Sequence, residues 1–143
     1  MFSTVGLPKW KITSSAMKVN TQYMHVIRFQ IKTKEKNLQY KEILDRFEKD
    51  KFVSVTKHMT ANRVFSFGRD HGFYGRIYNQ AVICEPSLQV INTDEGSTIS
   101  GFLFTPQDGN SLLSSIAATL YGLHGDEYKK YLAHFHQFLK AKI

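Results

Sequence analysis

The first long apolar segment of the chain follows a period of two. Between Met24 and Lys32, apolar side chains alternate with polar ones, which predicts a strand with one buried and one wetted face. The apolar positions are Ile27, Phe29 and Ile31, and the polar positions are Arg28, Gln30 and Lys32. Residues 39–49 follow a helical period instead, because apolar side chains recur at i, i+3, i+4 and i+7: Tyr40, Ile43, Leu44 and Phe47.

The rest of the chain divides into short strands followed by two helical segments. Apolar runs predict strands at 52–56, 80–84, 88–91 and 98–104, whereas residues 60–70 fit either a helix or a strand. The polar cluster 92–96 ends in glycine and predicts the turn of a hairpin. One helix follows the break at Pro106, and a last helix begins near Asp126.

This order of elements, β-α-β-(α)-β-β-β-α-α, predicts an α+β fold. We expect a mixed, mostly antiparallel sheet with the helices on one face. Residues 1–123 are predicted to form one α+β domain, and residues 124–143 a C-terminal amphipathic helix that packs on it.

Charge is distributed unevenly along the chain. The 19 Lys and Arg residues outnumber the 12 Asp and Glu residues, which gives a formal net charge of +7. Residues 1–80 hold 15 of the basic and 6 of the acidic side chains. A basic half of this kind is typical of a solvated lysine-rich surface, and it also suits nucleic acid or another anionic partner.

The composition narrows the cellular setting and the chemistry. A single cysteine excludes an internal disulfide and a cysteine-based zinc site. No apolar run is long enough to span a bilayer, and the first residues lack the pattern of a signal peptide. We therefore expect a cytoplasmic protein without membrane contact.

Motifs for catalysis or cofactor binding are missing from the sequence. It has neither a glycine-rich phosphate loop nor a nucleophile elbow, so we expect no cofactor. Cys84 ends an apolar run and is interpreted as a buried structural thiol. His134 and His136 point about 200° apart on a helix, which argues against a shared metal ion. We predict no catalytic residues and no metal site.

One stretch mixes basic and aromatic residues in the manner of an RNA-binding strand. Residues 69–78 faintly match the aromatic strand of an RNA-recognition motif, although glycine and arginine interrupt the aromatic spacing. The alternative is a glycine-rich loop whose rings pack on the core. If the basic half binds an anion or nucleic acid, the residues we expect to take part are Lys57, Arg63, Arg69, Tyr74 and Arg76.

Val19, Thr21, Met24 and His25 match the segment "VPTTLMH" of one enzyme family, with Asn20 in place of its proline. Later segments follow that family's order: 42–48, 52–56, 75–78, 85–90, 98–104 and 106–120. The chain thus resembles, over roughly residues 8–123, the C-terminal catalytic domain of archaeal-type glyceraldehyde-3-phosphate dehydrogenases. The family's cofactor-binding Rossmann domain has no counterpart here, and Cys84 stands in a different context from its nucleophile.

The resemblance leads to three hypotheses of different classes. The first is a non-catalytic, stand-alone binding or scaffolding module whose sheet face meets a protein partner or a second copy, since in the resembled family this face makes subunit contacts. That face would carry Ile27, Phe29, Leu88, Val90, Phe102 and Phe104 or their alternates. The second is a nucleic-acid (RNA) binding protein that uses residues 1–80. The third is a fragment or split subunit of a dehydrogenase that needs a separate Rossmann chain.

Overall fold

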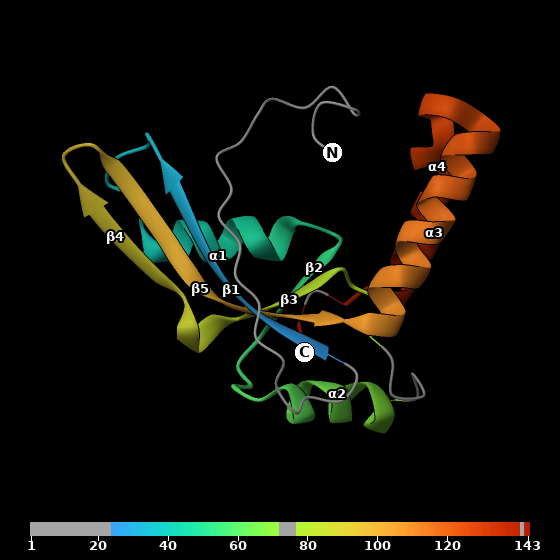
Figure 1. The fold of residues 1–143 in the computed structure, drawn as a ribbon, viewed down its shortest axis with the longest axis horizontal. Coiled ribbons are helices and arrows are strands. Elements are labelled where there is room, and N and C mark those ends of the chain that lie inside the picture. Colours follow the sequence, from blue (N-terminus) through green and yellow to red (C-terminus); the bar gives the residue numbers. More distant parts are fainter. Residues whose placement is uncertain (1–23, 72–76, 141) are drawn as a thin grey trace.

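The chain folds into one twisted sheet with helices around it (Figure 1). The computed structural model describes residues 24–71, 77–140 and 142–143. The strands are β1 (Met24–Thr33), β2 (Val53–Thr56), β3 (Ala81–Cys84), β4 (Gln89–Thr93) and β5 (Gly96–Pro106). The α-helices are α1 (Tyr40–Lys49), α2 (Ala61–Asp70), α3 (Gln107–His124) and α4 (Tyr128–Leu132). Short 3-10 helices are η2 (Glu85–Ser87), η3 (Gly125–Glu127) and η4 (Ala133–Phe138).

The sheet has the order β1-β5-β3-β2. The fifth strand, β4, also pairs with β5, next to β3. Strands β2 and β3 run parallel, and the other pairs are antiparallel. The prediction of an α+β fold with a mixed, mostly antiparallel sheet is therefore confirmed. Strand β1 pairs with β5 over its full ten residues without a bulge.

The helices lie on both faces of the sheet, so the prediction of helices on one face is wrong. Phe29 and Ile99 pack under α1, whereas Met24 and Phe104 have the opposite parity in the β1–β5 register and pack under α2. The chain crosses the sheet from β1 to β2 through α1 and returns from β2 to β3 through α2. Right-handed crossovers made in opposite directions place their helices on opposite faces, which accounts for the arrangement.

Residues 60–70, which fit either a helix or a strand, are helical. Thr60 caps α2, since its side-chain oxygen accepts a hydrogen bond from the backbone N–H of Arg63 at 3.4 Å. Ala61, Val64 and Gly68 are buried at helical spacing against the sheet. The cap and the stripe of small residues together select the helix.

The C-terminal segment is less helical than predicted. Instead of one amphipathic helix from Asp126, the chain forms η3, the short α4 and η4, and then returns to the sheet. Lys142 bridges in parallel to Val55, and the backbone N–H of Ile143 donates to the Val55 carbonyl at 3.0 Å. The C-terminal residues thus cover the outer edge of β2.

Ser87 lies in η2, between β3 and β4, the two strands that pair with different parts of β5. Between the part of β5 that pairs with β4 and the part that pairs with β3, the N–H of Phe102 donates to Ser87 Oγ at 2.8 Å. The Ser87 hydroxyl in turn donates to the Cys84 carbonyl at 2.7 Å. A serine hydroxyl therefore pairs with a β5 backbone group that neither strand satisfies.

We expect Ser87→Ala to lower the free energy of unfolding by about 1–2 kcal/mol, because the Phe102 N–H and the Cys84 carbonyl lose this partner. Urea titration followed by circular dichroism measures the change. The same substitution at Ser115, which is exposed in α3, is expected to change stability by less than about 0.5 kcal/mol. Equal effects of the two substitutions would contradict the role given to Ser87.

Candidate functional site

Helix α2 covers only one end of its face of the sheet, and no other helix or strand of the described residues packs on the rest of that face. The remaining side chains on this face come from three neighbouring strands, as their registers show. We call this surface the open sheet face: Val26, Arg28, Gln30 and Lys32 of β1, Thr98, Ser100 and Phe102 of β5, and Gln89 and Ile91 of β4. All nine are exposed except Thr98 and Ser100, which are intermediate.

Large apolar side chains are exposed on this surface. Val26 is 40%, Phe102 43% and Ile91 53% exposed, although each belongs to a regular strand. On the opposite face, α1 packs on the equivalent part of the sheet, where Ile99 is only 8% exposed. On the α1 side the helix buries Ile99 and packs on Phe29, while the other face leaves Val26, Phe102 and Ile91 in contact with solvent.

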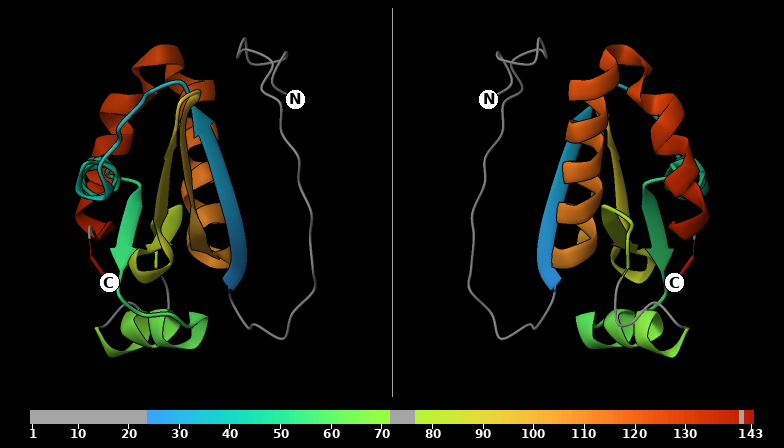
Figure 2. Two further views of the ribbon diagram at one scale, coloured as in Figure 1. Left: turned by 90° about the vertical axis from the view of Figure 1, so that its left-hand side faces the viewer. Right: turned by 90° about the vertical axis from the view of Figure 1, so that its right-hand side faces the viewer.

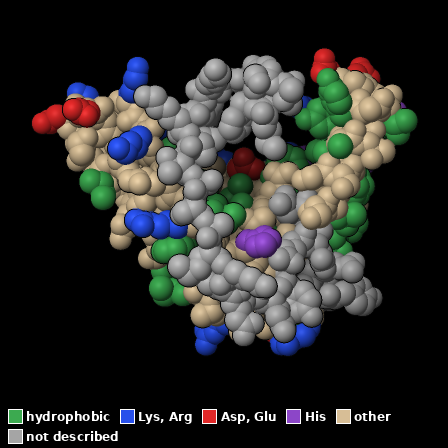
Figure 3. Space-filling view, viewed as in Figure 1, with side chains coloured by type: hydrophobic (Ala, Val, Ile, Leu, Met, Phe, Trp, Pro, Cys, Tyr) green, Lys and Arg blue, Asp and Glu red, His purple; other side chains and the backbone are tan. Residues whose placement is uncertain are grey.

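The charge of the open sheet face is positive. Arg28 and Lys32 stand four positions apart on β1 and thus on the same side, and the face carries no carboxylate. Neither cation forms an ion pair with the residues that the structure describes. In Figure 3, Lys and Arg side chains lie on the side of the molecule that carries the β4–β5 hairpin, and acidic side chains lie at its tip.

The two carboxylates closest in sequence to β1 bind a cation of α1. Glu35 and Glu42 both bind the guanidinium of Arg46, at 3.1 and 2.7 Å. These hydrogen bonds, and then the charge of Glu35, raise the pKa of Arg46 above its ordinary value. The acids closest in sequence to β1 are thus occupied by a cation of α1, and β1 keeps its positive charge.

The predicted sheet-face residues separate into four groups, which corrects the prediction of one shared surface. Leu88 and Phe104 are buried, and Phe29 and Val90 pack under α1. Ile27 is exposed at 44% on the α1 side. Of the predicted set, Phe102 lies on the open sheet face; the alternates that join it, Val26 and Ile91, complete its apolar part.

The predicted anion-binding residues are not gathered into one site where the structure describes them. Lys57 precedes α2, and Arg63 and Arg69 are exposed on that helix. The two arginines are six residues apart, so they lie about 9 Å apart along the axis and about 120° apart around it. Asp70 binds Arg69 at 2.9 Å, and this hydrogen bond and charge raise the pKa of Arg69. Tyr74 and Arg76 lie outside the described residues.

The groups considered for catalysis and metal binding have structural contacts. Cys84 is 3% exposed, and its Sγ lies 3.6 Å from the backbone carbonyl of His58 rather than from an imidazole. His136 packs against Phe52, and His124 stacks on Tyr131. Over the described ranges, no three His, Cys, Asp or Glu side chains are placed to share a metal ion.

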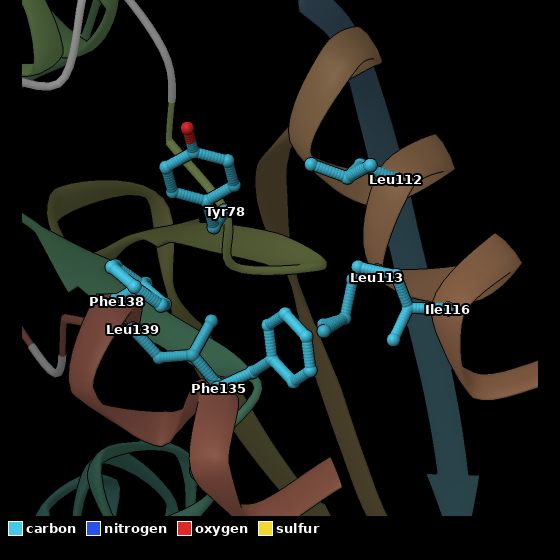
Figure 4. Close-up of a pocket in the computed structure, with 7 residues that line it drawn as sticks. All are labelled: Tyr78, Leu112, Leu113, Ile116, Phe135, Phe138 and Leu139. Carbon is cyan, nitrogen blue, oxygen red and sulfur yellow. The ribbon is translucent and has the colours of Figure 1, made fainter. Parts of the chain in front are cut away.

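An apolar pocket of about 180 Å³ lies away from the open sheet face, between α3 and the C-terminal segment. Figure 4 shows Phe135, Phe138 and Leu139 facing Leu113 and Ile116, and Tyr78 and Leu112 complete the lining. The Tyr78 hydroxyl is the one side-chain polar group among these seven residues, so a charged ligand finds no partner there.

The site residues that sequence reasoning missed are Arg28, Lys32, Val26 and Ile91. The alternation in β1 placed both cations on a wetted face, but it did not show that this face also carries apolar neighbours. Those neighbours arrive from β5 and β4 through the register, for example Phe102 directly opposite Arg28. One sequence signal could have revealed the apolar part of this face. Val26 is an apolar residue on the side of the strand where Arg28, Gln30 and Lys32 are polar.

Comparisons with protein-family models, with curated proteins and with solved structures find no match to this chain. Among the helices of the described ranges, none combines the length and apolar character needed to cross a membrane.

Proposed function

We propose that the chain is a non-catalytic binding module that docks a partner protein on its open sheet face. The observation that carries the proposal is the joint exposure of Val26, Ile91 and Phe102 on a face beside two cations that lack ion-pair partners among the described residues. Val26 lies diagonally beside Phe102, and Ile91 lies further along the face, beyond the polar pair Gln89 and Ser100. Exposed large apolar side chains rimmed by polar residues are typical of protein interaction sites. The buried contacts of Cys84 support a role without thiol chemistry.

The chemistry of the face indicates what kind of partner it fits. An aromatic ring and an arginine side by side are the residue types most enriched at the energetic centres of protein interfaces. Arg28 and Lys32 favour a partner with negative charge, because a positively charged partner would be repelled. The partner is therefore a protein surface with an apolar centre and Asp or Glu side chains beside it.

Phe102→Asp tests the proposal. We expect it to weaken capture of the partner by the tagged full-length chain at least tenfold, because a carboxylate replaces the apolar centre of the face. Leu123→Asp is the matched control: Leu123 is 71% exposed on α3, and its replacement is expected to leave capture within about twofold. Circular dichroism confirms that both variants fold. Equal binding by wild type and Phe102→Asp would contradict the proposal.

The two other hypotheses predict different outcomes of the same capture experiment. Nucleic-acid binding predicts affinity that falls steeply with salt and is lost on nuclease treatment, because phosphate contacts release counterions. A split dehydrogenase subunit predicts capture of a nucleotide-binding chain and aldehyde oxidation after mixing. Salt-tolerant capture that Phe102→Asp abolishes, without such activity, supports the binding module.

A further inference from the structure

The outer edge of β1 is a second surface that a partner can use, and it is distinct from the open sheet face. Strand β1 is the terminal strand of the sheet order, and over residues 26–33 no strand among the described residues pairs with its outer side. Figure 2 shows β1 on the side of the sheet away from α1 and the C-terminal segment. The opposite edge, at β2, is covered by the chain's own residues 142–143.

On the side that faces α1, strand β1 lacks the features with which proteins protect an edge, and its two charged side chains, Arg28 and Lys32, lie on the other face. It is ten residues long and contains no proline, glycine or bulge. The side chains that it directs to the α1 side are His25, Ile27, Phe29, Ile31 and Thr33, and none of them is Lys, Arg, Asp or Glu. A long, regular edge without charge on one of its faces favours the addition of another strand.

We infer that this edge pairs with β1 of a second copy of the chain, antiparallel and centred on Phe29. In that register Phe29 lies opposite its own copy, and Ile27 lies opposite Ile31 of the copy. On the other face, Arg28 meets Gln30 and Val26 meets Lys32. Between Val26 and Lys32, every pair is therefore apolar–apolar or joins one cation to a neutral side chain, and His25 meets Thr33.

Neighbouring registers are less favourable. Moving the centre to Arg28 places two arginines opposite each other, and moving it to Gln30 places Arg28 opposite Lys32 twice. Like charges directly opposite on paired strands are destabilising. The sequence of β1 is thus self-complementary in one central register.

Pairing in this register also accounts for the exposure of two isoleucines. Ile27 and Ile31 are 44% and 45% exposed, and they flank Phe29, whose ring packs on Phe47 of α1 at 6.2 Å. In the pair of copies they cover each other across the junction and link the two cores that lie under α1. The inference does not depend on the proposed function, because it rests on the backbone edge of β1 and on Ile27, Phe29 and Ile31, which lie on the opposite face from Phe102 and Ile91.

A pair of double variants tests this inference. Ile27→Lys/Ile31→Glu places a lysine opposite a glutamate of the copy at both symmetry-related positions, whereas Ile27→Lys/Ile31→Lys places like charges there. Sedimentation equilibrium of the full chain over a range of concentrations measures the dimer dissociation constant. We expect wild type and the Lys/Glu variant to dimerise, and the Lys/Lys variant to dimerise at least tenfold more weakly.

Both variants change the same two exposed positions, so a general loss of folding would affect them alike, and thermal unfolding checks this directly. A wild-type chain that stays monomeric at every concentration would overturn the inference. Dimers that both double variants weaken equally, or that Phe102→Asp abolishes, would also overturn it, since the contact would then lie elsewhere.

Discussion

Gly96→Ala is expected to lower the free energy of unfolding by at least about 3 kcal/mol, or to prevent folding. Gly96 begins β5 with φ at +143°, a conformation that L side chains rarely adopt. A Cβ atom built there would lie 2.1 Å from the backbone carbonyl oxygen of Thr33. Because that oxygen belongs to β1, relief of the clash requires the end of one strand to move away from the other.

Gly122→Ala is the matched control for this prediction. Gly122 lies within α3, and a Cβ atom there would meet nothing within 4 Å. Since glycine costs a helix interior about 0.5–1 kcal/mol relative to alanine, this variant is expected to be more stable than wild type. Urea unfolding measures both variants. A Gly96→Ala chain as stable as wild type would contradict the close contact between β5 and β1.

Asn79→Leu is expected to lower the free energy of unfolding by about 2–3 kcal/mol. Asn79 is 1% exposed, and its amide pairs with the backbone of Lys140 like a neighbouring strand: Nδ2 donates to the carbonyl and Oδ1 accepts from the N–H, each at 3.0 Å. Ser54 Oγ donates to the same carbonyl. Leucine cannot make either bond, so the Lys140 N–H loses this partner.

Asn79→Leu is expected to loosen the C-terminal segment locally, in addition to lowering the stability of the whole chain. Without the Asn79 amide, the C-terminal residues should separate from β2, and hydrogen exchange at the Ile143 amide, which donates to Val55, should accelerate. Asn62→Leu, at an exposed position of α2, is expected to change stability by less than about 0.5 kcal/mol. Unchanged exchange at Ile143 in Asn79→Leu would show that Asn79 does not hold this segment.

Period and turn chemistry predicted the individual elements of this fold well. The alternation from 24 to 32 became β1, the helical spacing from 39 to 49 became α1, and the turn at 92–96 joins β4 to β5. These features depend on neighbours in sequence. The faces on which the helices lie depend on the direction of each crossover, and a hydrophobic pattern along one element carries no information about that direction.

The same distinction between local and long-range contacts explains why the candidate site was predicted only in part. Ile27 and Ile31 were expected to be buried with Phe29, but only Phe29 reaches the ring of Phe47, because β1 is the terminal strand. The open sheet face combines Arg28 with Phe102, which are far apart in sequence and meet only through the β1–β5 register. The C-terminal helix was predicted from its apolar spacing, whereas Asn79 and Val55 draw its last residues into contact with the sheet.

Side-chain footprinting of the full chain, free and bound to its captured partner, tests the open sheet face as a docking surface most directly. Hydroxyl radicals label exposed Val26, Ile91 and Phe102, and mass spectrometry reads the extent of labelling at each. We predict that the partner lowers labelling at these three positions several-fold and leaves Leu123 of α3 unchanged. Full labelling of the three in the complex, with protection on α3 or α2 instead, would contradict the account.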